Sequence, residues 1–170
     1  MRNLIIFIII VGAGIFFYKK YFDKPEAMGE ITQPVYAEAH MTIEGKDRRG
    51  SGSRSIEAVT YMAAADEEDC QKQLEELKHS FDNRFCPGGT CELQKSECKS
   101  ELLPRYKRLF DNQPTSLTYI SFARGGPEER EARLIFWGIS VEESESLCAM
   151  VPAIQKKFKG KVSCVHALKE

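Results

Sequence analysis

The sequence has little excess of charge of either sign. Its 170 residues carry 24 Lys and Arg against 25 Asp and Glu, for a formal net charge of −1. A nucleic-acid-binding domain usually carries a strong basic excess, so this balance argues against nucleic acid as a partner. Hydrophobic residues at 42% and charged residues at 29% are ordinary for a globular protein.

Catalytic and metal-binding motifs are also lacking. The chain has no P-loop, no dinucleotide-binding glycine pattern and no serine in a nucleophile elbow. It has no C-x2-C motif, and its histidines (His40, His79 and His166) show no metal-ligand spacing. The acidic runs at 65–69 and 141–146 are better explained as helix starts, where the helix dipole favours carboxylates. The sequence therefore predicts no cofactor and no metal site, and it favours a protein without enzymatic activity.

Six cysteines are present, and four of them share one spacing. Fifteen residues separate Cys70 from Cys86, and fifteen separate Cys148 from Cys164. In the second pair, a helix from Cys148 to Gly160 would rise ~18 Å, and a strand back to Cys164 would recover ~13 Å. Both cysteines then lie at similar positions along the helix axis, close enough to form a disulfide. The spacing therefore predicts a bond that joins a helix to the next strand.

The predicted disulfides are Cys70–Cys86 and Cys148–Cys164, with Cys91–Cys98 as a third pair. A second connectivity stays open, because Cys86 could pair with Cys91 across the intervening PGGT, which leaves Cys70 for Cys98. The alternative to disulfides is a set of buried free thiols, which are common in protein cores. Disulfides persist in oxidising compartments, so the pattern predicts a domain outside the cytoplasm.

The first 22 residues contain the longest apolar run of the chain. No charged residue occurs from Leu4 to Tyr18. Fifteen residues is short for a membrane span of ~20, but Lys19 and Lys20 can extend it by placing their ammonium groups at the interface. No small-x-small cleavage site follows promptly. Residues 1–22 are therefore predicted to be an uncleaved signal-anchor, and a cleaved signal peptide is the alternative.

Two signals for the orientation of this anchor disagree. Lys19, Lys20 and Lys24 follow the apolar run and outnumber the charges before it, which slightly favours a carboxyl-terminal domain in the cytoplasm. The cysteine spacing favours the opposite side, because disulfides need an oxidising compartment. Since the charge difference is only about one unit, we expect the domain in the periplasm of a Gram-negative cell, with the anchor in the inner membrane.

A linker and one folded domain follow the anchor. Residues 23–36 contain two prolines and a glycine and are predicted to be the linker, and 37–170 the domain. Residues rich in β-branched and aromatic side chains predict strands at 40–45, 54–63, 117–123, 131–139 and 161–168.

Helices are predicted between these strands. Apolar residues at i, i+4, i+7 and i+11 indicate one helix after Asp66 and another after Ser140, which makes a capping box with Glu143. Pro152 should kink the second of these helices or shift its start. Pro104 suits the first turn of a further short helix between the two halves.

The same order of elements occurs twice in the domain. Hairpin, acidic helix start, apolar stripe and cysteine pair follow one another in both halves, and matching residues lie 76 to 78 positions apart. We interpret this as an internal duplication with repeats at about 37–98 and 115–170. The predicted fold class is α+β: tandem ββαβ repeats that form a two-layer, mainly antiparallel sheet with helices on one face, preceded by a single transmembrane helix.

One loop is a candidate binding site. Arg48, Arg49 and Arg54 surround a glycine-serine loop whose backbone amides and guanidinium groups could bind an anion or an acidic partner. The alternative is a solvated hairpin tip. The corresponding loop of the second half carries Glu128 and Glu129, so the two loops would present opposite charge.

Taken together, these features predict a membrane-anchored extracytoplasmic interaction or scaffold module of an envelope assembly. It would be stabilised by disulfides and would have no catalytic chemistry. Its expected partners are the membrane, through residues 4–18, and an envelope protein. The alternative function is a thiol-dependent redox protein that uses Cys91 and Cys98, because this pair has no counterpart in the second half.

Overall fold

The computed structural model describes residues 34–46, 53–80, 91–126 and 129–168. The predicted anchor and the predicted linker up to residue 33 lie outside this part of the chain, so both stay predictions. Among the residues described, no helix is both long and apolar enough to cross a membrane.

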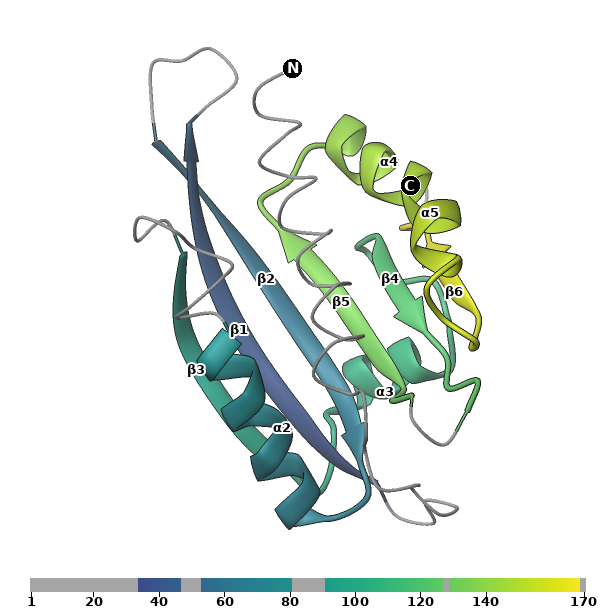
Figure 1. Ribbon diagram of the computed structural model, residues 1–170. Coiled ribbons are helices and arrows are strands. Elements are labelled where there is room, and N and C mark those ends of the chain that lie inside the picture. The colour runs from purple at the N-terminus through teal and green to yellow at the C-terminus, as the bar shows by residue number, and fades with distance from the viewer. Residues whose placement is uncertain (1–33, 47–52, 81–90, 127–128, 169–170) are drawn as a thin grey trace.

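In the described part of the chain, six strands form one antiparallel sheet of an α+β fold (Figure 1). The strands are β1 (Val35–Lys46), β2 (Ser53–Ala64), β3 (Cys91–Lys99), β4 (Tyr119–Phe122), β5 (Ala132–Trp137) and β6 (Val162–Val165). Their order is β3-β1-β2-β5-β4-β6, and every neighbouring pair is antiparallel. The predicted α+β class with a mainly antiparallel sheet is therefore confirmed, and the first strand begins two residues before the predicted domain boundary.

The strands of the two halves follow the same order. The first half is arranged β3-β1-β2 and the second β6-β4-β5, and β2 pairs with β5 at the centre of the sheet. In each half the first two strands form an antiparallel pair, and the third strand pairs with the first. The position of β3 was not predicted, because the charged residues along it weaken the hydrophobic signal of a strand.

The helices are α2 (Glu67–Ser80), α3 (Pro104–Phe110), α4 (Val141–Ala149) and α5 (Val151–Gln155). Local sequence explains where they begin. Asp66 accepts a hydrogen bond from a backbone N–H in the first turn of α2, and Ser140 forms the predicted capping box with Glu143 at the start of α4. Pro104 occupies the first turn of α3. The helix of the second half is divided into α4 and α5 next to Pro152, in agreement with the predicted kink.

Helices pack on both faces of the sheet (Figure 1). One face carries α2 and the α4–α5 pair, and its buried residues include Ala39 and Met62. The opposite face carries α3, whose Leu109 packs with Tyr61 and Ile135. The helices of the two halves, α2 and α4–α5, lie on one face as predicted, whereas α3 lies on the other, so the predicted two-layer arrangement is wrong. The physical reason is that successive strand residues alternate between faces, and apolar side chains of β2 and β5 point to both sides.

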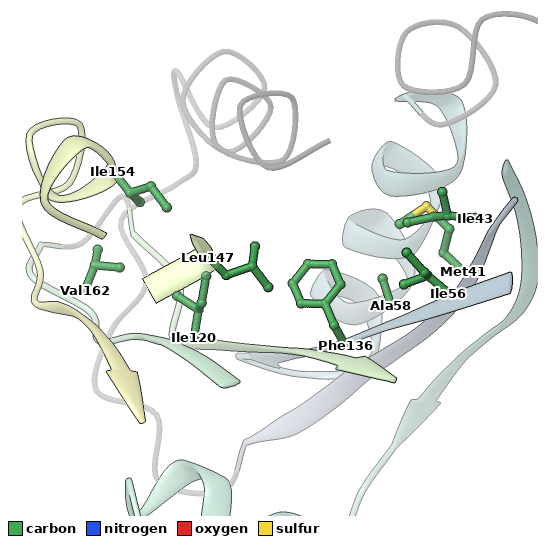
Figure 2. Packing of buried hydrophobic residues seen from close by; sticks show 9 residues of the cluster. All are labelled: Met41, Ile43, Ile56, Ala58, Ile120, Phe136, Leu147, Ile154 and Val162. Atoms are coloured by element: carbon green, nitrogen blue, oxygen red, sulfur yellow. The ribbon is translucent and has the colours of Figure 1, made fainter. Parts of the chain in front are cut away.

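The core beneath α4 and α5 joins the two halves. It comprises Met41, Ile43, Ile56, Ala58, Ile120, Phe136, Leu147, Ile154 and Val162. Phe136 lies between the side chains contributed by β1 and β2 and the remaining side chains of the second half (Figure 2). Burial of a side chain of this size contributes ~1.5–3 kcal/mol. The two halves therefore share one core.

Two disulfides fasten helices to the sheet. Cys70, in the first turn of α2, is bonded to Cys98 near the end of β3, with the two Cα atoms 6.0 Å apart. Cys148 of α4 is bonded to Cys164 of β6, with a Cα separation of 5.3 Å. The predicted Cys148–Cys164 bond is thus confirmed, and each half has one bond between its helix and its third strand.

The predicted Cys70–Cys86 and Cys91–Cys98 bonds are wrong, because Cys70 and Cys98 are bonded to each other. Cys91 is disulfide-bonded as well, and Cys86 lies outside the described residues. The reason is the direction of the chain. Since β3 runs back along α2, the first turn of α2 lies beside the end of β3 and not beside its beginning.

The loop that follows β4 closes against the turn before β6. The carboxylate of Glu129 accepts hydrogen bonds from the backbone N–H groups of Gly125, Lys159 and Gly160, at 2.9, 2.5 and 2.7 Å. A Cβ atom on Gly160 would lie 1.8 Å from the carbonyl oxygen of Ala123, so only glycine permits this approach. Glu129, predicted on a hairpin tip, therefore serves to hold two loops together.

Candidate functional site

The face of the sheet that carries α3 is covered by this helix only in part. The uncovered side chains lie over β3, β1 and one end of β2 and β5, and we name them the open face: His40, Glu57, Lys95, Glu97, Lys99 and Trp137. Directly paired residues of antiparallel strands project to the same side. His40 pairs with Lys95, and Glu57 pairs with Trp137, so the strand register places these side chains on one surface.

A buried carboxylate lies beneath this surface. Glu38 of β1 is only 3% exposed. Its Oε1 is 2.6 Å from His40 Nε2 and accepts a hydrogen bond from the Tyr61 hydroxyl at 3.3 Å. Its Oε2 forms an ion pair with Lys99 of β3. Buried charges in proteins are usually paired in this way, because an unpaired one costs several kcal/mol of desolvation (order of magnitude).

His40 bridges two carboxylates. Its Nδ1 is 2.8 Å from Glu57 Oε1, and its Nε2 is the nitrogen that faces Glu38. A neutral imidazole has one N–H, so it can donate only one of these two hydrogen bonds. Both are donated when the ring is doubly protonated. The bridge connects β1 to β2, while Lys99 connects β1 to β3.

The surroundings shift the pKa values of Glu38 and Tyr61 away from neutrality. Burial raises the pKa of Glu38, but hydrogen bonds from Lys99 and His40 outweigh it, and the net pKa is lowered. The pKa of Tyr61 is raised by burial, by its hydrogen bond with Tyr106 and by the charge of Glu38. Glu38 is therefore ionised at neutral pH and Tyr61 is protonated.

Glu38 suits a structural role better than a catalytic one. A general base or acid works best with a pKa near the operating pH, and it must reach its substrate. Glu38 meets neither condition, since its pKa is lowered and its side chain is buried. The buried carboxylate instead fixes the positions of Lys99 and His40 at the surface. On the same face, Trp137, which pairs with Glu57, is 41% exposed, and tryptophan is enriched at the energetic centres of protein interfaces.

The lowered pKa of Glu38 gives a testable pH dependence. A carboxyl whose pKa is lower in the folded state stabilises the fold above its unfolded-state pKa, and the stabilisation is lost as the pH falls through the folded-state pKa. We expect the free energy of unfolding to decline below pH ~4.5, and Glu38→Gln to lower it by ~1–3 kcal/mol at pH 7 and to flatten the decline. Urea unfolding at several pH values measures both effects.

The control for this experiment is Glu97→Gln. Hydrogen bonds from Lys95 and Lys99 also lower the pKa of Glu97, but its side chain is 37% exposed, so solvent screens its charge. We expect a smaller effect than for Glu38→Gln. Equal pH profiles for the two variants would contradict the role given to the buried carboxylate.

The arginines of the predicted anion site are placed only in part. Arg54 lies on β2, and its Nη2 donates a hydrogen bond to Glu143 Oε2 at 2.8 Å. This ion pair joins the β1–β2 hairpin to the start of α4. Arg48 and Arg49 lie outside the described residues, so anion binding at this loop stays a prediction.

The two cysteines of the predicted redox alternative are not brought together. They lie near opposite ends of β3, seven positions apart in sequence, and extended chain of this length separates their Cα atoms by ~23 Å. Cys98 is bonded to Cys70, and Cys91 is also disulfide-bonded. A strand cannot fold back on itself to join its own ends, so Cys91 and Cys98 do not form a dithiol pair.

The Glu38 cluster was missed from the sequence, although its signal is present there. Glu38 and His40 are separated by one residue, and so are Lys95, Glu97 and Lys99. Charged residues at every second position indicate a strand with one polar face. The sequence does not show that the two segments are adjacent strands, because that adjacency depends on the return of β3 beside β1.

The chain matches no family model, no curated protein sequence and no solved structure.

Proposed function

We propose that this chain is a membrane-anchored interaction module of an envelope assembly. Residues 4–18 would hold it in the inner membrane, and the domain at 37–170 would lie in the periplasm. The observation that carries this proposal is a pair of disulfides. One joins α2 to β3 in the first half, and the other joins α4 to β6 in the second half. Such bonds persist in oxidising compartments.

The open face is the surface we propose for the partner. It combines an exposed tryptophan with charges of both signs, which are fixed by the buried Glu38. Because β1 begins at Val35, at most twelve residues (23–34) are left for the linker, which spans at most ~43 Å when extended, so the partner would lie near the membrane surface. The loop with Arg48, Arg49 and Arg54 is proposed as a second contact for an acidic group.

We further propose that the domain arose by internal duplication. Two features support this reading. The strand order of the first half is repeated in the second, and the third strand of each half is bonded to the helix that precedes it. The pairs differ in spacing, since 28 positions separate Cys70 from Cys98 and 16 separate Cys148 from Cys164.

The compartment is tested by peptide mapping without reduction, on protein taken from its native membrane after the free thiols are blocked. We expect peptides linked through Cys70–Cys98 and Cys148–Cys164, and protein that stays in the membrane pellet after carbonate extraction. Six free thiols would contradict the extracytoplasmic location. A mature amino terminus beyond residue 22 would show that the anchor is cleaved.

The interaction surface is tested in cells by photo-crosslinking. A photoreactive residue at Trp137 or Lys95 should form an adduct with an envelope protein. The same residue at Ala153, which is exposed on α5 on the opposite face, is the matched control and should not. Adducts at Ala153 without adducts at Trp137 or Lys95 would move the interface away from the open face.

A further inference from the structure

Three potential metal ligands meet at the outer edge of the sheet. The sulfur atoms of Cys148 and Cys164 and one ring nitrogen of His166 all lie within 4.8 Å of one another. Cys164 lies on β6, His166 follows two positions later, and Cys148 reaches them from α4. Among the described residues, no histidine forms such a group with the sulfur atoms of Cys70 and Cys98.

The two helix-to-strand disulfides also differ in accessibility. Cys70 is completely buried, and only its partner Cys98 is partly exposed. Cys148 and Cys164 are half-buried, and His166 is exposed. Exchange between a thiol and a disulfide requires that the attacking thiolate reach a sulfur atom. The Cys148–Cys164 bond is therefore the more open of the two to a reductant.

We propose that Cys148, Cys164 and His166 form a redox-gated site for a d10 metal ion, with Zn²⁺ as the representative ion. A dithiol reductant opens the site: the bond between the two cysteine sulfurs breaks, and a disulfide forms in the reductant. Two electrons and two protons pass to the protein and give two thiols. Zn²⁺ then displaces both thiol protons into solvent and binds two thiolates and the imidazole. This site goes beyond the proposed interaction function and does not depend on it.

The ligand set fits this ion. Zn²⁺ prefers cysteine sulfur and histidine nitrogen in tetrahedral geometry, at about 2.3 Å and about 2.0 Å. Two thiolates on one Zn²⁺ are then ~3.8 Å apart. The Cα separation of 5.3 Å accommodates this spacing after side-chain rotation, without a change in the backbone. A water molecule can take the fourth position, as in sites with three protein ligands.

The test is metal titration of the full chain before and after mild reduction with a phosphine, which takes up one oxygen atom from water as it reduces the disulfide. Co²⁺ is the spectroscopic probe, because thiolate coordination gives a charge-transfer band, and competition with Zn²⁺ gives the affinity. We expect no band for the oxidised protein. The reduced protein should bind one equivalent and release two protons.

Variants assign the ligands. His166→Ala should weaken Zn²⁺ binding by at least ~10-fold, whereas Lys161→Ala, an exposed change at the start of β6, should leave it unchanged. Cys148→Ser/Cys164→Ser should abolish the band. A band that survives in the double variant would come from the other cysteines and would overturn the proposal. So would unchanged affinity in His166→Ala or the absence of binding to the reduced chain.

Discussion

Replacing Arg133 with methionine is expected to lower the free energy of unfolding by ~3–5 kcal/mol. The side chain of Arg133 is completely buried, on the face of the sheet that carries α3. Its guanidinium donates to the carbonyl oxygens of Leu109 at 2.6 Å and Phe110 at 2.8 Å. These are the last two carbonyls of α3, and the carbonyls at a helix end have no partners within the helix.

Arg133 also joins α3 to the sheet. It donates to the carbonyl oxygens of Ala132 and Phe122 at 2.9 and 3.2 Å, and to Glu131 Oε1 at 2.6 Å. The ring of Phe110 stacks against the guanidinium, with its centroid 4.6 Å from Cζ. Methionine fills a similar volume but donates no hydrogen bond, so the carbonyl oxygens of Phe110 and Phe122 would lose this donor. The carbonyl oxygen of Leu109 would keep its hydrogen bond from the backbone N–H of Asn112.

Urea unfolding of the full chain, followed by circular dichroism, measures this loss. Arg108→Met is the matched control, because Arg108 is exposed on α3, and it should change stability by less than ~0.5 kcal/mol. The loss of stability in Arg133→Lys should lie between the two, because lysine keeps the positive charge but lacks the planar guanidinium with its five N–H donors. If Arg133→Met behaved like Arg108→Met, the guanidinium would not be what holds α3 to the sheet.

Removing the Cys70–Cys98 disulfide with Cys70→Ser/Cys98→Ser is expected to destabilise the domain by ~3.5 kcal/mol. The bond closes a loop with a sequence separation of 28, and the closed loop limits the freedom of the unfolded chain. It also fastens α2 to β3, which has one neighbour, β1, among the strands that the structure describes. Denaturant unfolding under non-reducing conditions measures the change.

Cys148→Ser/Cys164→Ser is the comparison variant for this prediction. Its shorter loop, with a separation of 16, predicts a loss of ~3 kcal/mol. The two losses should therefore be similar, with the larger one in the first half. A loss below ~1 kcal/mol for Cys70→Ser/Cys98→Ser would mean that packing alone holds α2 on the sheet, and that the bond adds little.

Features that depend on neighbouring residues were predictable from the sequence. The capping box of Ser140 and Glu143, the first turn of α3 at Pro104 and the division of the second helix beside Pro152 all agree with the structure. The apolar stripe of the second helix was also predicted, and its Leu147 and Ile154 are buried in the main core. Each depends on contacts between residues a few positions apart, which the sequence displays directly.

The Cys148–Cys164 bond was predictable for the same reason. One helical segment and one returning strand separate its two cysteines. Their positions along the helix axis therefore follow from the rise per residue of each element. The same reasoning failed for Cys70. Its partner was decided by β3, a charged strand without a clear sequence signal, whose far end lies beside the start of α2.

The sequence alone thus determined the local elements of this protein, its α+β class and the bond that closes a single helix–strand unit. The tertiary structure alone decided the partner of Cys70, the face on which α3 packs, and the burial of Glu38 and Arg133. These depend on which strands become neighbours. Glu38 meets Lys99 only because β3 returns beside β1, and Arg133 meets the end of α3 only because α3 packs on the face opposite to α2. Such contacts join residues distant in sequence, and no local spacing specifies them.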